Sequence, residues 1–167
     1  LAALADSLIA QTAGIAAANA QDLAAAADAG LDAAMLDRLR LDAPRVAALA
    51  SDVRSLLDLP DPLAVRFDQR VLPNGLQLHR RRVPIGVLGV IYESRPNVSV
   101  DVAALAIKSG NAAVLRGGKE ANATNRVLVG IVQAALVQSG LPQAAISLIA
   151  STERAHVLSL LKLDDCI

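Results

Sequence analysis

The sequence predicts an α/β fold in which N-terminal helices and a β-hairpin precede a parallel sheet. Three observations support this prediction. Residues 1–60 are rich in alanine and leucine at helical spacing. Residues 64–82 alternate apolar and polar side chains, as strands do. From Val83 onward, short apolar runs alternate with amphipathic segments, which is typical of parallel strands joined by helical crossovers.

Composition and charge exclude several classes of protein. With 54% hydrophobic and 19% charged residues over 167 positions, the chain is globular rather than disordered. Its 16 basic and 16 acidic residues cancel, which argues against a nucleic acid or an anionic membrane held by bulk charge. The aromatic side chains are Phe67 and Tyr92, too few for base stacking. A lone cysteine, Cys166, excludes an internal disulfide and fits a reducing compartment such as the cytoplasm.

The first 60 residues predict three or four helices. Four apolar side chains are expected on one face of the first: Leu1, Leu4, Leu8 and Ile9. A second helix is expected to open at Asn19 or Gln21 and to stop at Gly30. Asp42 is expected to cap a helix that runs to about Leu57.

Residues 64–82 predict a β-hairpin, because two alternating stretches flank the turn residues Pro73, Asn74 and Gly75. An isolated hairpin is only marginally stable in water, so we expect it to pair with something outside itself. A second subunit is one candidate, and the protein is then a homo-oligomer. The basic run 80–82 is interpreted as a solvated hairpin edge or a subunit contact.

The rest of the chain predicts three repeats of strand and helix. A near-continuous apolar run, VPIGVLGVIY at 83–92, is typical of a strand buried on both faces. The predicted elements after it are a helix at Ser99–Ser109, a strand at Ala112–Leu115, a helix at Glu120–Gln138, a strand at Ala145–Ile149 and a helix at Thr152–Leu161. Ligands of parallel sheets bind at the carboxyl ends of the strands, so loops 92–98, 116–119 and 150–153 are the candidate site.

The middle loop favours a phosphate group. Gly117 and Gly118 let the backbone turn sharply and approach a ligand closely, and Arg116 and Lys119 add two positive charges. The helix that follows is expected to point free N–H groups and its positive dipole end at the same place. Neither a Walker loop nor a G-x-G-x-x-G fingerprint is present. The alternative is a connecting turn whose charges face water.

The loop YESRPN gathers Glu93, Arg95 and Asn97 after an apolar strand. Arginine holds carboxylates and phosphates with paired hydrogen bonds, and asparagine donates to a developing oxyanion. The alternative is an internal Glu93–Arg95 ion pair with a helix N-cap. The two histidines, His79 and His156, lack metal-ligand spacing, and no metal site is predicted.

Two motifs carry a resemblance to a known family. IYESRPNVSVD and LRGGKEA, within VPIGVLGVIYESRPNVSVDVAALAIKSGNAAVLRGGKEA, resemble the signature of the gamma-glutamyl phosphate reductase family, a branch of the aldehyde dehydrogenase superfamily. The segments ANAQDLAAAADAGLDAAMLDRLRLD and SGLP are similar to that family too. The resemblance implies a Rossmann-like parallel sheet of the aldehyde dehydrogenase type. It also implies NADPH-dependent reduction of L-glutamyl 5-phosphate to L-glutamate 5-semialdehyde in proline biosynthesis.

The resemblance also implies roles for individual residues. Arg116 corresponds to a basic residue near the adenosine ribose. Lys119 stands where enzymes that prefer NAD often carry a glutamate, and an ammonium attracts the 2′-phosphate that a carboxylate repels. NADPH is therefore the expected cofactor, bound by Arg116, Gly117, Gly118 and Lys119. The oxyanion-stabilising asparagine of the superfamily aligns with Glu93 rather than Asn97, so both remain candidates beside Arg95.

The nucleophile of the family is a cysteine in a second domain downstream, whose thiolate attacks the acyl phosphate before hydride transfer. Cys166 does not match that position and is interpreted as a structural thiol. Both ends of the sequence interrupt predicted elements, the last one a strand entered at LDDCI, so we expect part of a longer protein without its catalytic domain.

Three regions are predicted: helices at 1–63, a hairpin at 64–82, and a partial NADP-binding domain at 83–167. The alternatives are the reductase part of a bifunctional pyrroline-5-carboxylate synthase, or a non-catalytic nucleotide-binding module. The resemblance implies L-glutamyl 5-phosphate as substrate and a contact with glutamate 5-kinase as a further partner.

Overall fold

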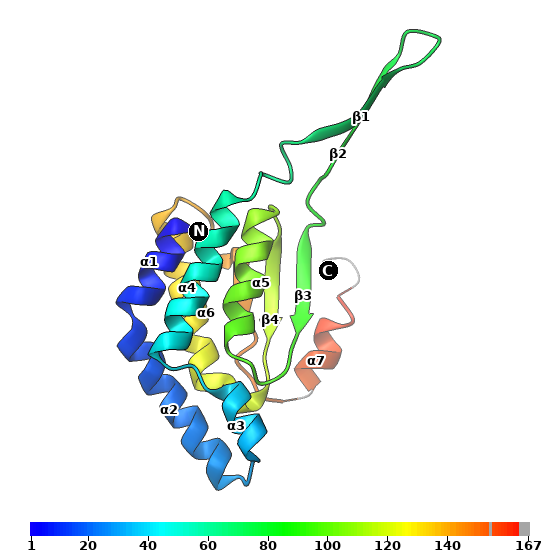
Figure 1. The fold of residues 1–167 in the computed structure, drawn as a ribbon. Coiled ribbons are helices and arrows are strands. Elements are labelled where there is room, and N and C mark those ends of the chain that lie inside the picture. The colour runs from blue at the N-terminus through cyan, green and yellow to red at the C-terminus, as the bar shows by residue number, and fades with distance from the viewer. Residues whose placement is uncertain (154, 164–167) are drawn as a thin grey trace.

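The structure is a computed structural model that describes residues 1–153 and 155–163 (Figure 1). Its N-terminal half contains helices α1 Ala2–Ala10, α2 Thr12–Asp28, α3 Ala33–Leu39 and α4 Ala43–Asp58, then strands β1 Arg66–Val71 and β2 Gln77–Arg81. Its second half contains β3 Val87–Ile91, α5 Asn97–Lys108, β4 Ala112–Arg116, the 3₁₀ turn η1 Lys119–Ala121, α6 Asn122–Gln138, the 3₁₀ turn η2 Gln143–Ala145, β5 Ile146–Leu148 and α7 Ala155–Leu160. The predicted order of helices, hairpin and alternating strands and helices is confirmed.

The parallel sheet is confirmed as well. β3 and β4 pair in parallel with Val87 opposite Ala112, and β4 and β5 pair in parallel with Ala113 opposite Ile146. The strand order is β3-β4-β5. Gly110 adopts a φ of 72° after α5, a left-handed conformation that glycine reaches without strain, and so ends the helix as predicted.

The run 83–92 differs from its prediction as a strand buried on both faces. Strand geometry is confined to Val87–Ile91, and Ile85 before it is 83% exposed. Ile91 within the strand is exposed too. Side chains of a strand alternate between its faces, and Leu88 and Val90 pack against the hydrophobic core while Ile91 on the other face is exposed. One face of β3 is therefore covered, not both.

The N-terminal helices correct two further predictions. α2 is already helical from Thr12, so neither Asn19 nor Gln21 opens it. Asn19 is instead buried in mid-helix, where its side-chain Oδ1 accepts a hydrogen bond from the backbone N–H of Leu41 at 2.7 Å. Ile9 is exposed rather than part of the apolar face of α1. The predicted cap at Asp42 is confirmed, because its carboxylate accepts from the Arg45 amide at 3.1 Å.

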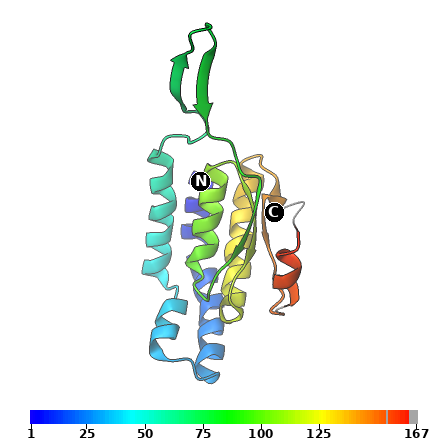
Figure 2. The ribbon, with the colours of Figure 1, turned by 90° about the vertical axis from the view of Figure 1, so that its right-hand side faces the viewer.

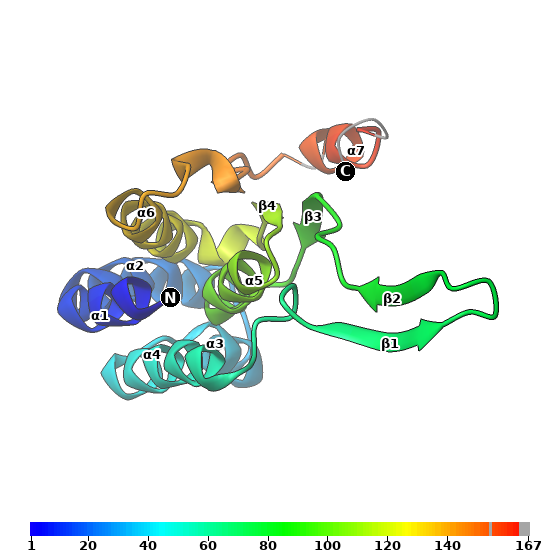
Figure 3. The same ribbon diagram turned by 90° about the horizontal axis from the view of Figure 1, so that it is seen from above.

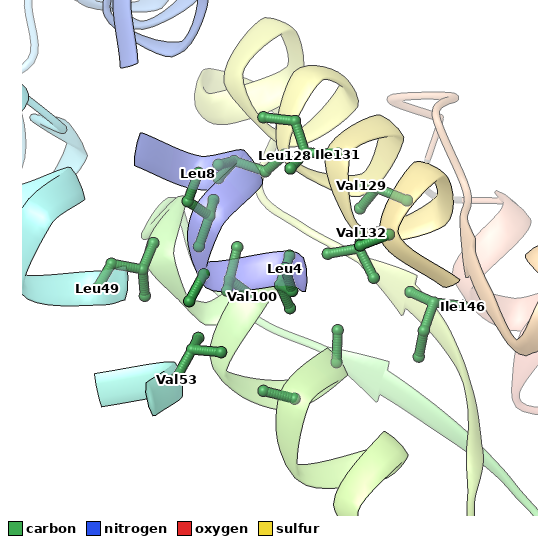
Figure 4. Close-up of a cluster of buried hydrophobic side chains, with 14 of the residues drawn as sticks. Leu4, Leu8, Leu49, Val53, Val100, Leu128, Val129, Ile131, Val132 and Ile146 are labelled. Atoms are coloured by element: carbon green, nitrogen blue, oxygen red, sulfur yellow. The ribbon is translucent and has the colours of Figure 1, made fainter. Parts of the chain in front are cut away.

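One hydrophobic core joins the N-terminal helices to the sheet (Figure 4). Leu4 and Leu8 of α1 and Leu49 of α4 belong to the same buried cluster as Leu128 of α6 and Leu115 of β4. α5 and α6 pack against one side of the sheet, and α1, α2 and α4 form a further layer on α5 and α6, as the view in Figure 3 shows. The helical region and the sheet region predicted from the sequence therefore contribute side chains to the same hydrophobic core.

The hairpin of β1 and β2 extends away from this body (Figures 1 and 2). Its strands are antiparallel, and Gly75 in the turn has a φ of 85°, as the predicted turn requires. Apolar side chains on it face solvent, with Val71 69% exposed. Nowhere in the described ranges is a helix long and apolar enough to cross a membrane.

Candidate functional site

The three loops predicted as the site meet at one edge of the sheet. The amide of Tyr92 donates to the carbonyl of Arg116 at 3.0 Å, and the amide of Ile149 donates to the carbonyl of Leu115 at 2.9 Å. These bonds continue the parallel ladder past the strand ends, so loops 92–98, 116–119 and 150–153 start side by side. Their convergence at the carboxyl ends of β3, β4 and β5 follows from the topology.

The two glycines of the middle loop are required by contacts between the loops. A Cβ at Gly118 would lie 2.1 Å from the Ser94 Oγ and 2.8 Å from the Ser94 backbone nitrogen. A Cβ at Gly117 would lie 2.3 Å from the Asn125 Nδ2 and 3.0 Å from the Tyr92 ring. Contacts under 3.0 Å would force Ser94 and Asn125 to shift, so glycine permits close packing of protein on protein at both positions.

Arg116 is not presented to solvent as a free cation. Its side chain is only 9% exposed, and its guanidinium donates to the carbonyls of Gly117 and, at 3.1 Å, Thr152. Its Nε is buried and has no hydrogen-bond partner within the described residues. The side chain therefore ties loop 116–119 to loop 150–153, and its predicted contact with a cofactor stays a prediction.

Lys119 has the accessibility that Arg116 lacks. It is exposed at the start of η1 and lines a hollow of about 420 Å³, here called the Lys119 hollow, together with Thr152 and Ala26 of α2. Glu120 borders the same hollow and accepts a hydrogen bond from Ser94. The Lys119 ammonium is thus the cation of this turn that a ligand in the hollow can reach.

Glu120 is held in its charged form. Burial acts to raise the pKa of Glu120, but the hydrogen bond from Ser94, a backbone hydrogen bond and the charges of Lys119 and Arg116 outweigh it, so the pKa is lowered. An anionic Glu120 beside Lys119 partly offsets the positive charge of the turn.

The prediction that α6 aims free N–H groups at this turn is wrong. α6 begins at Asn122, after the 3₁₀ turn, and its amides at Ala123 and Thr124 donate to the Asp22 carboxylate at 3.1 and 2.7 Å. Asp22 lies on α2, about a hundred residues earlier, so no local pattern around residue 120 reveals it. The positive end of α6 is therefore already matched by a protein carboxylate.

The YESRPN loop splits between two hollows. Glu93 and Arg95 are exposed and line a hollow of about 430 Å³ with Gly118, here called the loop hollow. Asn97 instead begins α5, donates to Asp101 at 2.9 Å, and lines a smaller hollow of about 240 Å³ between α3, α4 and α5. No Glu93–Arg95 ion pair forms within the described residues, so that alternative is not realised.

Two features of the site were missed by sequence reasoning. Arg38 of α3 borders both hollows that the YESRPN loop touches, and nothing in its short helix signals this. The second is a buried polar chain in which the Tyr92 hydroxyl lies 2.6 Å from the Ser99 Oγ, which donates to the Asn125 Oδ1 at 2.9 Å. Burial raises the pKa of Tyr92, and the hydrogen bond with Ser99 opposes this only in part.

Other candidates lie apart from the three loops. His79 is exposed on β2, and His156 on α7 lies 3.9 Å from Glu153. The residues that the structure describes contain no group of three metal-ligating side chains. Cys166 and the strand predicted at LDDCI lie outside the described residues.

Comparison with known proteins decides what this architecture is related to. No family model matches the chain. A gamma-glutamyl phosphate reductase from Vibrio cholerae is 54% identical over 167 residues, which is 100% of this chain and 40% of that protein. The chain is homologous to gamma-glutamyl phosphate reductases over its whole length. It spans about two-fifths of the length of these relatives, 40% in the Vibrio protein.

Solved structures agree with this relationship. The crystal structure of the gamma-glutamyl phosphate reductase from Thermotoga maritima matches 99% of this chain with a TM-score of 0.95 and 35% identity, and 40% of that chain is covered. A probable aldehyde dehydrogenase from Listeria monocytogenes matches with a TM-score of 0.72 at 17% identity, covering 99% of this chain and 34% of its own. The predicted resemblance to gamma-glutamyl phosphate reductase and the aldehyde dehydrogenase type of fold are confirmed.

Proposed function

We propose that the intact protein containing this chain reduces L-glutamyl 5-phosphate to L-glutamate 5-semialdehyde and phosphate, using NADPH. The observation that carries this proposal is the homology of the whole chain to gamma-glutamyl phosphate reductases at 54% identity. The reaction would place the protein in proline biosynthesis, in the cytoplasm. These 167 residues would contribute the binding and positioning groups on the cofactor side of the site.

The cofactor assignment is supported by Lys119. A 2′-phosphate carries two negative charges at neutral pH, and an accessible ammonium at the rim of a hollow of about 420 Å³ attracts it. NADPH, when bound, supplies the hydride. Gly117 and Gly118 keep the backbone of the turn free of side chains, while Arg116 holds the turn against loop 150–153 through Thr152. The residues of the turn thus fit a phosphate-bearing nicotinamide cofactor.

The acyl phosphate end of the substrate is assigned to the loop hollow. Arg95 is exposed there and can hold phosphate oxygens with paired hydrogen bonds. Asn97 donates its amide to Asp101, so stabilising an oxyanion would require it to leave that partner. Glu93 stands in the same hollow as Arg95, but a carboxylate only accepts hydrogen bonds unless protonated. We therefore assign phosphate binding to Arg95. We assign stabilisation of the oxyanion to Asn97, whose amide can donate to it after leaving Asp101.

The hairpin is proposed to join subunits of a homo-oligomer. Its apolar side chains Val71 and Leu76 are exposed, and a two-stranded ribbon that projects from the body offers unpaired strand edges. Contact with glutamate 5-kinase, which would supply the labile acyl phosphate, remains a further proposal. The reductase part of a bifunctional pyrroline-5-carboxylate synthase has the same site, and a kinase region in the full-length protein would favour it.

The reverse reaction tests the proposal in the full-length protein. L-glutamate 5-semialdehyde and NADP⁺ should give NADPH only when inorganic phosphate is present, because phosphate must release the acyl group from the enzyme. Formation of NADPH without phosphate would indicate an aldehyde dehydrogenase that transfers the acyl group to water. No NADPH under either condition would favour the alternative of a non-catalytic nucleotide-binding module.

A further inference from the structure

A hollow next to the YESRPN loop carries charges that the assignments above do not use. It has a volume of about 240 Å³ and lies between α3, α4 and the start of α5, and it is here called the α3–α4 hollow. Arg38 and Arg40 line it from the end of α3, Asp52 lines it from α4, and Asn97 lines it from α5. Both signs of charge therefore border one small space.

The two arginines are available to an anion. Neither Arg38 nor Arg40 forms an ion pair, and neither guanidinium forms a hydrogen bond, within the described ranges. Arg45, which also lines the hollow, is different because its guanidinium bonds the Asp37 carboxylate at 2.6 Å and the Arg40 carbonyl at 3.0 Å. The hollow thus has one arginine fixed by the protein and two that are not.

The acidic side of the hollow is separated from the arginines along α4. Asp52 is two turns beyond Arg45, about 10 Å along the helix axis. Asp101 of α5 shares a separate hollow between α4 and α5 with Asp52. Burial and then the Asp52 charge raise the pKa of Asp101, and the hydrogen bond from Asn97 opposes this only in part. In the part of the chain that the structure describes, neither carboxylate has an ion-pair partner. A bound cation would relieve the repulsion between them.

We infer that the α3–α4 hollow binds the amino-acid head of the substrate, with the α-carboxylate at Arg38 and Arg40 and the α-ammonium at Asp52. This inference rests on the proposed function, because it assigns a binding site to the α-carboxylate and α-ammonium of a glutamyl substrate, which the acyl phosphate site does not bind. Arginine matches a carboxylate with paired hydrogen bonds, and the opposite charges of the head match the two ends of the hollow.

Arg38 connects this inference to the acyl end of the substrate. It borders both the α3–α4 hollow and the loop hollow, which contains Arg95. A glutamyl group has its head and its reacting carbonyl separated by a short carbon chain, so the two ends can occupy neighbouring hollows. Asn97, the first residue of α5, lines the α3–α4 hollow, and Arg95 two residues before it lines the loop hollow. Aldehydes of similar length without the head would lose these contacts and bind poorly.

The test compares two aldehydes in the full-length enzyme. Oxidation of L-glutamate 5-semialdehyde and of butyraldehyde, which lacks the head, is measured with NADP⁺ and phosphate. Arg38→Gln should raise KM for the semialdehyde about tenfold or more, because a charge-assisted pair is lost. Its kcat should change little, and kcat/KM should fall far less for butyraldehyde than for the semialdehyde. Asp52→Asn should also raise KM for the semialdehyde. Arg54→Gln is the matched control, because Arg54 pairs with Asp6 away from the hollow.

Calorimetry of L-glutamate binding tests the inference without relying on turnover. The unsubstituted enzyme should bind L-glutamate, and Arg38→Gln should weaken that binding about tenfold. If turnover depends on phosphate but Arg38→Gln leaves both KM and L-glutamate binding unchanged, the inference is wrong while the proposed function stands. If the enzyme binds L-glutamate through Arg38 but shows no phosphate-dependent turnover, the proposed function fails and the head-group site stands. An equal loss of kcat/KM for both aldehydes would show a general structural role and overturn the inference.

Discussion

Asp22 on α2 and Thr124 on α6 are joined by two hydrogen bonds across 102 residues of sequence. The Asp22 carboxylate accepts from the Thr124 amide at 2.7 Å and from the Thr124 hydroxyl at 2.6 Å, and it also accepts from the Ala123 amide at 3.1 Å. Asn19, one turn earlier on α2, donates to the same hydroxyl at 3.3 Å. The N-terminal helices therefore fix the helix that follows the basic turn.

Asp22→Ala should destabilise the chain strongly. The substitution removes the cap of α6 and leaves buried donors without partners, so the free energy of unfolding should fall by about 2 kcal/mol or more. Urea unfolding followed by circular dichroism measures this. Asp28→Ala is the matched control, because Asp28 is exposed at the end of the same helix, and it should have little effect. Equal stability of the two variants would contradict the capping role.

Gly118→Ala and Gly130→Ala should have effects of opposite sign. A Cβ at Gly118 would meet the Ser94 backbone at 2.8 Å, so the loops must shift and the chain should lose about 1–3 kcal/mol of stability. Gly130 lies in mid-helix on α6 with nothing within 4 Å of its Cβ position, so alanine there should stabilise by about 0.5–1 kcal/mol. Thermal unfolding of both variants gives the comparison, and stabilisation by Gly118→Ala would refute the loop contact.

Ser94→Ala should raise the pKa of Glu120. With Ser94 present, the pKa of Glu120 lies below its ordinary value of 4.5. Charged Glu120 therefore stabilises the folded chain above pH 4.5, and this contribution is lost as the pH falls through the folded pKa. Carboxyl carbon NMR titration of Glu120 measures the shift. Ser55→Ala on α4 should leave it unchanged, whereas an unchanged pKa in Ser94→Ala would remove the assigned cause.

Charged substitutions on the hairpin should reduce assembly without unfolding the chain. Val71→Lys with Leu76→Lys introduces charge at two exposed apolar positions outside the core, so an interface there should weaken while the circular dichroism spectrum stays constant. Sedimentation velocity of the full-length protein gives the mass. Leu141→Lys, at an exposed position after α6, is the control. A variant that keeps the mass of the unsubstituted protein would show that subunits join elsewhere.

Local patterns predicted most of the fold. Asp42 as a helix cap, Gly75 in the hairpin turn and Gly110 after α5 each depend on neighbours within a few residues, and each is confirmed. The burial predicted for VPIGVLGVIY is too high, because apolar character does not reveal whether both faces of a strand are covered.

The site was harder to predict, because its contacts are long-range. The sequence around Arg116 does not reveal that the Thr152 carbonyl accepts from its guanidinium, so a buried tether was interpreted as a free cation. The N-terminus of α6 was expected to be free because Asp22 lies on another helix. Asn97 was grouped with Glu93 and Arg95 by sequence, but its position at the start of α5 turns it toward Asp101. Lys119 is exposed and has no such tether within the residues that the structure describes, and its role at the 2′-phosphate stays a prediction.

The most direct measurement is the cofactor preference of the full-length enzyme carrying Lys119→Glu. If the Lys119 ammonium receives the 2′-phosphate, kcat/KM for NADPH should fall about tenfold or more, while the value for NADH should change about threefold at most. Lys162→Glu, at an exposed position after α7, controls for the change in net charge. An equal loss with both cofactors, or no loss with either, would contradict the assignment of Lys119 to the 2′-phosphate.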